Sequence, residues 1–176
     1  MVQWFHGASP KAQRWAVLLN LVYASLVVPY YYENSGMGLA HYAKILKDKP
    51  YVYGNHDMPH DAAVREMSAG EHAKSRVEVA EELGIKPVIV VERPRNTDAV
   101  MNGIETVRNS LGTCWFDERK CATGISALEG YRAEYDEEKK VLRNTPLHDH
   151  NSHGADGFRT FAVGYRPKQI NKPYRR

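Results

Sequence analysis

The sequence predicts an α/β protein in which a mostly parallel sheet is covered by helices. One observation supports this class, and a second indicates the number of domains. First, runs of β-forming residues alternate with stripes of apolar residues at helical spacing, as at residues 74–83 followed by 87–91. Parallel strands need helical crossovers of this kind. Second, the chain has 176 residues, 43% of them hydrophobic, which suits one domain with a core of its own.

The first expected strand lies in the apolar run of residues 16–32. The start of this run, behind Lys11 and Arg14, has the outline of a secretory signal peptide, but it is short for a membrane crossing and Asn20 interrupts it. Its second half is rich in β-forming residues and leads directly into the turn signal Glu33-Asn34-Ser35-Gly36. We therefore expect a buried strand rather than a signal peptide.

The following elements alternate regularly. Apolar stripes predict helices over residues 39–48, 74–83 and 100–111, and glycines 84 and 112 would end the second and the third. A longer stripe from Cys121 to Tyr135 predicts a fourth helix. Short strands are expected at residues 51–53, 87–91 and 114–116.

The last expected helix carries the first candidate site. Ser152 fits an N-cap position, and apolar residues including Ala155 and Phe158 recur behind it at helical spacing. This spacing places His153 and Asp156 on a neighbouring face. Because small residues flank Asp156, a second element or a metal ion could approach its carboxylate closely. A solvated surface acid is the competing interpretation.

Charge and cysteine content bound the setting. The formal net charge is +3, and residues 166–176 hold five Lys and Arg without an acid. We expect a disordered basic tail that contacts a polyanion, or else a solubilising terminus. The spacing of Cys114 and Cys121 fits neither a redox pair nor a zinc site, which favours a reduced, cytoplasmic setting.

A second candidate site follows the strand expected at residues 51–53. Sheets of this class bind ligands at the carboxyl ends of their strands, so His56, Asp57, His60 and Asp61 are well placed. The stretch Gly54-Asn55-His56-Asp57 taken alone resembles the signature of calcineurin-like metallophosphoesterases. That family also needs acidic motifs upstream, and residues 1–32 contain no Asp or Glu. A polar surface loop is the competing interpretation.

A series of short motifs, in order and with matching spacing, resembles the C-terminal nuclease domain of tailed-phage terminase large subunits over residues 30–165. The motifs are Tyr32-Glu33-Asn34-Ser35-Gly36, His41-Tyr42-Ala43-Lys44, Tyr51-Val52-Tyr53-Gly54, Pro59-His60-Asp61-Ala62, Lys74-Ser75-Arg76, Cys114-Trp115-Phe116-Asp117, Tyr131-Arg132 and Ser152-His153-Gly154-Ala155-Asp156. The resemblance implies a single RNase H-like domain over residues 1–165, with a mixed central sheet and an atypical stretch at 1–29. It also implies a metal-dependent endonuclease that cuts concatemeric double-stranded DNA during genome packaging.

The same resemblance assigns roles to particular residues. Asp61 and Asp156 match the catalytic carboxylates that hold two Mg²⁺ or Mn²⁺ ions, of which one activates water and the other stabilises the leaving 3′ oxygen. His60 and His153 would orient these ligands or the phosphate, or have a structural role. Lys74 and Arg76 would open a helix and contact phosphate, unless they form a solvated face. The implied partners are duplex DNA, the terminase ATPase domain, the small terminase subunit and the portal.

Three departures from the family pattern stand out. The acid expected on the first strand is absent, and the first carboxylate in the chain is Glu33. The phosphate-binding loop of the ATPase motor is also absent, and His150 stands where an aromatic residue is expected. A fragment boundary or an altered reading frame before about residue 29 would explain the first two. A non-catalytic remnant that retains DNA affinity is therefore the alternative to an active endonuclease.

Overall fold

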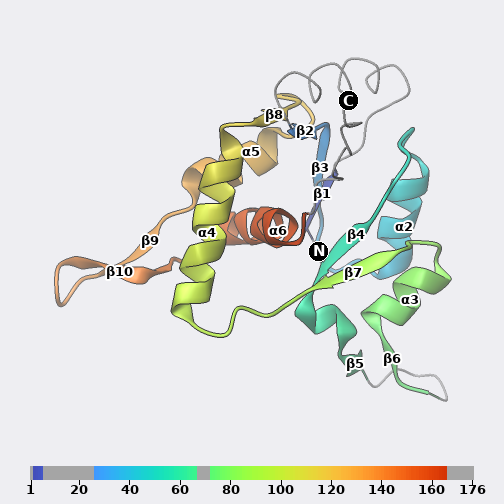
Figure 1. Cartoon of the computed structure of the whole chain (residues 1–176), viewed down its shortest axis with the longest axis horizontal. Helices are drawn as coiled ribbons and strands as arrows, with labels where there is room; N and C mark the ends of the chain where they lie inside the picture. Colours follow the sequence, from blue (N-terminus) through green and yellow to red (C-terminus); the bar gives the residue numbers. More distant parts are fainter. Residues whose placement is uncertain (1, 6–25, 67–71, 166–176) are drawn as a thin grey trace, which may run out of the picture.

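The computed structural model describes residues 2–5, 26–66 and 72–165, which form a mixed α/β structure (Figure 1). The strands are β1 (Val2–Phe5), β2 (Leu26–Val28), β3 (Tyr30–Glu33), β4 (His56–Pro59), β5 (Arg65–Glu66), β6 (Lys74–Ser75), β7 (Val88–Val91), β8 (Cys114–Phe116), β9 (Ala133–Asp136) and β10 (Val141–Pro146). The helices are α2 (Leu39–Lys47), the 3₁₀ helix η1 (His60–Ala63), α3 (Arg76–Glu82), α4 (Thr97–Leu111), α5 (Ala122–Gly130) and α6 (His150–Gly164). The expected basic tail and residues 6–25 lie outside the described part.

The described strands pair in twos. β2 pairs with β8 and β4 pairs with β7 in parallel, whereas β1 with β3, β5 with β6, and β9 with β10 are antiparallel. Each parallel pair joins strands that are far apart in sequence and separated by helices. Both strand directions are thus present, as in a mixed sheet, but three of the five described pairs are antiparallel, so the mostly parallel sheet predicted from the alternation is wrong for this part of the chain. The described strands also form five two-stranded sheets instead of one continuous sheet.

Pro29 divides the strand expected between residues 21 and 32. The described part of this strand is confirmed, as β2 before Pro29 and β3 after it. Because proline has no N–H to donate, the ladder is interrupted there and the chain changes partner from β8 to β1. The Val28 carbonyl still accepts a hydrogen bond from the backbone of Asp117, at 3.1 Å.

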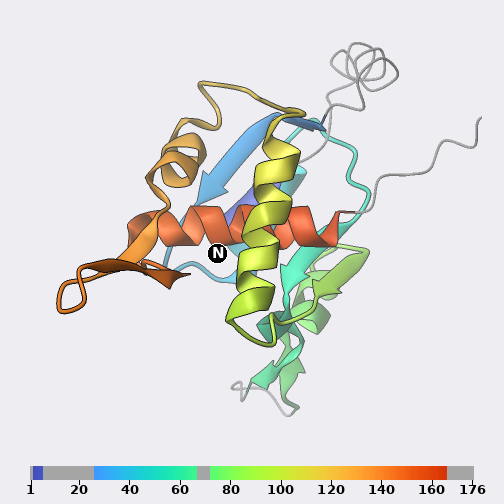
Figure 2. The ribbon, with the colours of Figure 1, turned by 60° about the vertical axis from the view of Figure 1, so that its left-hand side comes forward.

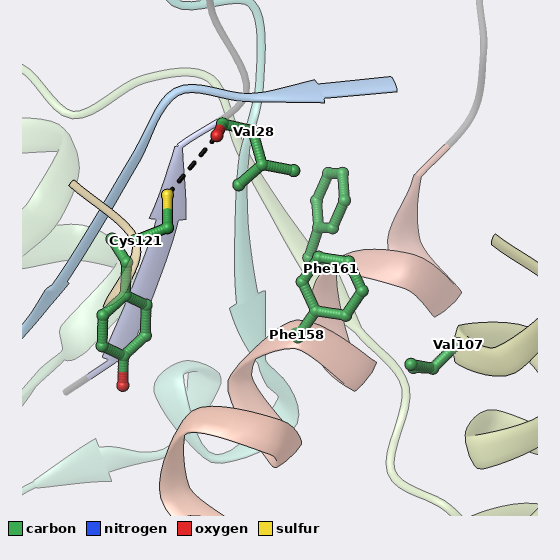
Figure 3. Close-up of a cluster of buried hydrophobic side chains, with 6 residues drawn as sticks. Val28, Val107, Cys121, Phe158 and Phe161 are labelled. Carbon is green, nitrogen blue, oxygen red and sulfur yellow. Dashed lines mark hydrogen bonds between the residues drawn. The ribbon is translucent and has the colours of Figure 1, made fainter. Parts of the chain in front are cut away.

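One hydrophobic core lies between β2, β3 and helices α4, α5 and α6. Its buried members are Val28, Tyr31, Val107, Cys121, Phe158 and Phe161. Figure 3 shows Phe158 and Phe161 projecting from α6 toward Val28 and Val107. The Cys121 thiol donates to the carbonyl oxygen of Val28 at 3.4 Å, so this core contains one weak polar contact. These contacts fix α6 against the strands.

A second core lies between α2, α3, η1 and β4. Its buried members are Ala43, Leu46, Met58, Ala62, Ala80 and Ile85. Strand β3 is shared by the two cores: Tyr31 packs into the first, while Tyr30 and Tyr32 pack against the second. This division follows from the alternation of side chains along a strand. Strand β3 therefore contributes side chains to both halves of the described structure.

Most of the helices predicted from periodicity are confirmed. Helix α2 buries Tyr42, Ala43 and Leu46 and ends one residue before Asp48. Helix α4 ends at Gly112, as predicted, and Asn96 caps its start by accepting a hydrogen bond from the Ala99 backbone. The strands at β7 and β8 are also confirmed.

Three predicted boundaries are wrong. Residues 51–53 form no strand: Val52 is 74% exposed, and the strand that pairs with β7 starts at His56. The fourth helix ends at Gly130, so Tyr135 lies in β9. The last helix starts at His150 with Asp149 as its N-cap, and Ser152 lies inside its first turn.

The β9–β10 hairpin was not predicted from the sequence. Figures 1 and 2 show that it projects away from the body of the structure, beyond the start of α6. Its turn includes Lys140 with a positive φ of 52°, a conformation that few non-glycine residues adopt. No helix in the described part of the chain has the length and apolar composition that crossing a membrane would require.

Candidate functional site

Asp61 lies in η1, directly after the carboxyl end of β4. Pro59 precedes the helix in an extended conformation, and Ala62 is buried against the second core at 3% exposure. Burial of Ala62 fixes the orientation of the short helix, and its neighbours His60 and Asp61 are exposed to solvent. The expected position of Asp61 at a strand end is thus correct, although the strand is β4 instead of residues 51–53.

The Asp61 carboxylate pairs with Arg76. Its Oδ2 accepts from Arg76 Nη1 at 3.1 Å, and both side chains are about half exposed, at 50% and 49%. A pair at this exposure contributes little to stability. Its cationic partner neutralises the acid, and Oδ1 of Asp61 has no hydrogen bond or ion pair with the described residues.

Lys74 and Arg76 stand at the start of α3, but only Arg76 belongs to the helix. Lys74 lies in β6 and binds Glu82 at 2.7 Å, which corrects its predicted position in the helix. Ser75 between them is the N-cap, and it forms a capping box with Glu78. Both cations therefore face carboxylates in this structure, and phosphate would compete with Asp61 and Glu82 for them.

Asp156 lies in α6 and has two partners on the same oxygen. Its Oδ1 accepts a hydrogen bond from the Tyr131 hydroxyl at 3.1 Å and forms an ion pair with Arg159 Nη1 at 3.2 Å. Tyr131 is the residue at which α5 ends, so this carboxylate connects the end of α5 to α6. Burial, followed by the charge of Asp156, raises the pKa of Tyr131 to about 12, so its hydroxyl stays protonated and remains a donor at neutral pH.

Arg159 is held in place by α4. The side chain is only 17% exposed, and a Cβ built on Gly103 would lie 3.0 Å from its Cδ. The arginine stem thus packs against the glycine, while its guanidinium reaches Asp156. Oδ2 of Asp156 has no partner in the described part of the chain, and the side chain is 32% exposed. That oxygen is the one available to a cation.

His153 lies one turn before Asp156 and is exposed. The histidine that contacts the first turn of α6 is His148, whose Nδ1 lies 3.3 Å from the Ser152 hydroxyl. No contact in the described part of the chain links His153 to Asp156.

The two candidate carboxylates have different partners. Helix α6 approaches β4 and β7 at its C-terminal end, where a Cβ built on Gly164 would lie 3.1 Å from Asp57 Oδ1 and 2.8 Å from Val91 Cγ2. Asp156 lies eight residues earlier, which is about 12 Å along a helix axis. The described residues contain no group of three or more His, Cys, Asp or Glu that could hold a metal ion. A shared metal site of Asp61 and Asp156 therefore stays a prediction.

Glu33, the first acid of the chain, lies near a different side of α6. It accepts a hydrogen bond from the Tyr31 hydroxyl, and that hydroxyl would lie 2.9 Å from a Cβ built on Gly154. Residues two apart in a helix do not face the same way. Tyr31 and its partner Glu33 therefore lie at the Gly154 side of α6, which is not the side that carries Asp156.

His56, the histidine of the metallophosphoesterase-like tetrapeptide, is a packed residue. It is 6% exposed, and its ring lies 5.3 Å from that of Tyr53. Tyr131 and Arg159 were not predicted as partners of Asp156. The spacing of Asp156 and Arg159 could have suggested an ion pair within one helix, whereas Tyr131 is brought in by tertiary packing.

Comparison with protein families, with curated proteins and with solved structures found no match to this chain.

Proposed function

We propose that the chain is a metal-dependent DNA endonuclease domain of the terminase type, with an RNase H-like arrangement of its strands. The observation that carries the proposal is the ordered series of motifs over residues 30–165, which resembles that family at Asp61 and at Asp156. The position of Asp61 after the carboxyl end of a parallel strand supports it, because such ends are the usual ligand-binding edge of α/β sheets. Helix α6, which carries Asp156, packs against the same strand pair.

Two divalent ions, Mg²⁺ or Mn²⁺, are the proposed cofactors. Each acid offers one carboxylate oxygen without a described partner, and hard cations prefer oxygen ligands. When bound, the ions would activate a water and stabilise the leaving 3′ oxygen. Tyr131 and Arg159 would orient Asp156 for this role, and Arg76 would move from Asp61 to a DNA phosphate. The remaining ligands would be waters and phosphate oxygens, since the described residues form no group of three or more His, Cys, Asp or Glu that could hold a metal ion.

The proposed substrate is double-stranded DNA in the cytoplasm of a host cell. By the same resemblance, the partners would be a terminase ATPase domain, a small terminase subunit and a portal. Binding to duplex DNA should involve mainly phosphates and should weaken steeply with salt. Within the motifs that carry the resemblance, Lys74 and Arg76 are the described cations closest to Asp61 in the sequence, so they are the proposed phosphate contacts.

A second candidate function is DNA binding without cleavage. It is favoured by the ion pairs of the two acids: Asp61 is paired with Arg76 and Asp156 with Arg159. A carboxylate that is already neutralised attracts a metal ion less strongly.

Cleavage of supercoiled plasmid separates the two candidates. We expect slow nicking with Mg²⁺, faster nicking with Mn²⁺, which binds such sites more tightly, and loss of cleavage in Asp61→Asn and Asp156→Asn. Asp98→Asn, in the first turn of α4, is the matched control and should cleave as the parent does. Unchanged cleavage in both site variants would contradict the proposal. If the protein binds DNA but cleaves it with neither Mg²⁺ nor Mn²⁺, the second candidate is established.

A further inference from the structure

A cavity of about 200 Å³ lies at the amino end of β4, where the C-terminal turns of α2 and α3 meet the segment that leads into the strand. His56, the first residue of β4, lines it, whereas Asp61 follows the other end of the same strand. The cavity is therefore separate from the candidate carboxylates. Its volume is below the roughly 300–1,000 Å³ of sites for drug-sized ligands, and it is partly open to solvent, so it can hold one ring system and not a large molecule.

The floor of the cavity is apolar and rigid. It includes Ala43, Leu46 and Ile85, which are buried members of the second core. Gly84 has a φ of +85°, which ends α3, and a Cβ built on it would meet only Lys47 Cε, at 3.9 Å. The absence of a side chain at this position keeps the floor open to a flat ligand.

One wall is aromatic. Tyr53 is fixed in place, because its hydroxyl donates to the Leu46 carbonyl at 3.1 Å and its ring packs against His56. The Tyr51 ring meets the Tyr53 ring edge-on, with centroids 6.3 Å apart. Tyr51 is partly exposed, so it presents an aromatic surface at the mouth of the cavity.

The rim carries two lysines. Lys47 and Lys49 both line the cavity, and neither pairs with an acid in the described part of the chain. Lys49 Nζ lies 3.6 Å from the centroid of the Tyr30 ring, a cation–π contact that limits the positions of the ammonium group. Asp48, which lies between them in the sequence, is exposed and has no ion pair with either. The rim can therefore take an anion.

We propose that this cavity binds a nucleotide, with the base against the tyrosines and the apolar floor and the phosphate at Lys47 and Lys49. Aromatic stacking combined with cations along the phosphates is the usual way in which proteins hold unpaired nucleotides. Every base has a π-face, so little preference among bases is expected. The nucleotide can be a free mononucleotide or an unpaired residue of a strand, and both sources have the same chemistry.

Titration of the full chain with defined probes tests the proposal, in buffer without divalent ions so that cleavage plays no part. The probes are AMP, adenosine, inorganic phosphate and a single-stranded dT oligonucleotide. We expect AMP to bind at least about tenfold more tightly than adenosine or phosphate, because only AMP fills both parts of the site. The double variant Lys47→Gln, Lys49→Gln should weaken AMP binding about tenfold or more.

The variants provide further controls. Tyr51→Ala should weaken AMP and oligonucleotide binding, with an unchanged circular dichroism spectrum. Lys44→Gln changes an exposed lysine of α2 that does not line the cavity, and it should bind as the parent does. For the oligonucleotide, the dependence of log K on log salt should flatten by about 0.7 in the double lysine variant, since the two lysines bind one phosphate and each phosphate contact on a single strand contributes about 0.7.

The outcomes are distinct. Binding of AMP that the site variants weaken supports a mononucleotide as ligand, and binding of the oligonucleotide alone that they weaken supports a strand. Equal affinity for phosphate and AMP would overturn the proposal, because the base would then contribute nothing. Affinity that is the same in the parent, the double lysine variant and Tyr51→Ala would also overturn it.

Discussion

The carboxylate of Asp156 is oriented by residues from three helices. Tyr131 at the end of α5 donates a hydrogen bond to Oδ1, and Arg159, which packs against Gly103 of α4, forms an ion pair with the same oxygen. Because both partners hold one oxygen, the direction of Oδ2 is fixed as well. Removal of the Tyr131 hydroxyl therefore tests how much the contact between the end of α5 and Asp156 contributes to stability.

Tyr131→Phe should destabilise the protein by about 1–2 kcal/mol. The substitution removes a hydroxyl that donates to an ionised acceptor in a half-buried position, and it keeps the ring in place. Urea denaturation followed by circular dichroism measures the difference. Tyr135→Phe, on the exposed side of β9, is the control and should stay within about 0.5 kcal/mol of the parent. Equal losses in the two variants would show that the Asp156 contact contributes nothing.

At the level of elements, the sequence predicted those whose pattern is local. Helices α2 and α4 and strand β7 were predicted because periodic apolar residues and end signals such as Gly112 lie within the elements themselves. Residues 51–53 are β-forming and predict a short buried strand, but β7 pairs with residues 56–59, and the tyrosines instead line a cavity. Tertiary pairing overrides local propensity there.

The end of α5 could not be predicted for a similar reason. The apolar stripe continues from Cys121 to Tyr135, yet the helix stops at Gly130. A Cβ built on Gly130 would lie 2.5 Å from the Asn151 side chain of α6, so close contact between the two helices fixes this glycine. That contact depends on tertiary structure, and the hairpin that follows was missed with it.

The capping box of α3 should make its stability depend on pH. The Ser75 backbone and hydroxyl donate to Glu78 at 2.7 and 2.9 Å, and these bonds, the backbone one first, hold the pKa of Glu78 below its usual value. A carboxyl with a lowered pKa stabilises the folded state at neutral pH, and this contribution is lost as pH falls through the folded pKa.

Glu78→Gln should therefore destabilise the protein at neutral pH and clearly less at about pH 3, because the amide keeps the shape of the side chain without the charge that the Ser75 N–H and hydroxyl stabilise. Urea denaturation at the two pH values measures the difference. Asn96→Ala removes the cap of α4, whose hydrogen bond involves no titratable group, so its cost should be the same at both. A Glu78→Gln cost that does not change with pH would contradict the role of Glu78.

Gly154→Ala should destabilise the protein by about 1–3 kcal/mol, although alanine favours helices. The added Cβ would lie 2.6 Å from the Ala127 Cβ and 2.9 Å from the Tyr31 hydroxyl, so α6 would have to move away from α5 and β3. Gly103→Ala in α4 is the comparison and should cost less, because its new Cβ would lie no closer than 3.0 Å to the Arg159 stem, which needs to shift by only a few tenths of an ångström. Thermal unfolding compares the two, and a stabilised Gly154→Ala variant would contradict the packing.

At the scale of the whole molecule, strand β3 should make the two cores unfold together. Tyr31 belongs to the first core, and Tyr30 and Tyr32 pack against the second, so neither core can lose β3 alone. Phe158→Ala in the first and Met58→Ala in the second should each cost about 2–5 kcal/mol. In both variants, far-ultraviolet circular dichroism and tyrosine fluorescence should give the same urea midpoint. Two separate transitions in either variant would show that the cores unfold independently.

Long-range arrangement is where prediction from sequence was weakest. The pairing of β2 with β8 and of β4 with β7 is not contained in any local pattern, nor is the change of partner at Pro29. For the candidate site, the chain position of Asp61 after a strand and of Asp156 in a helix was predictable. Their arginine partners come from tertiary and helix-surface contacts that a motif does not specify.

The labelling rate of the buried Cys121 thiol reports local opening of the first core. Burial, followed by the charge of Asp117, raises the pKa of this thiol to about 11, and the side chain is 0% exposed. A thiol reagent can react with it only after the α5 start has separated from β2, because the sulfur contacts Val28. The half-buried Cys114 is an internal comparison in the same core. The ratio of the two labelling rates thus measures how often this part of the core opens while the rest of the protein stays folded.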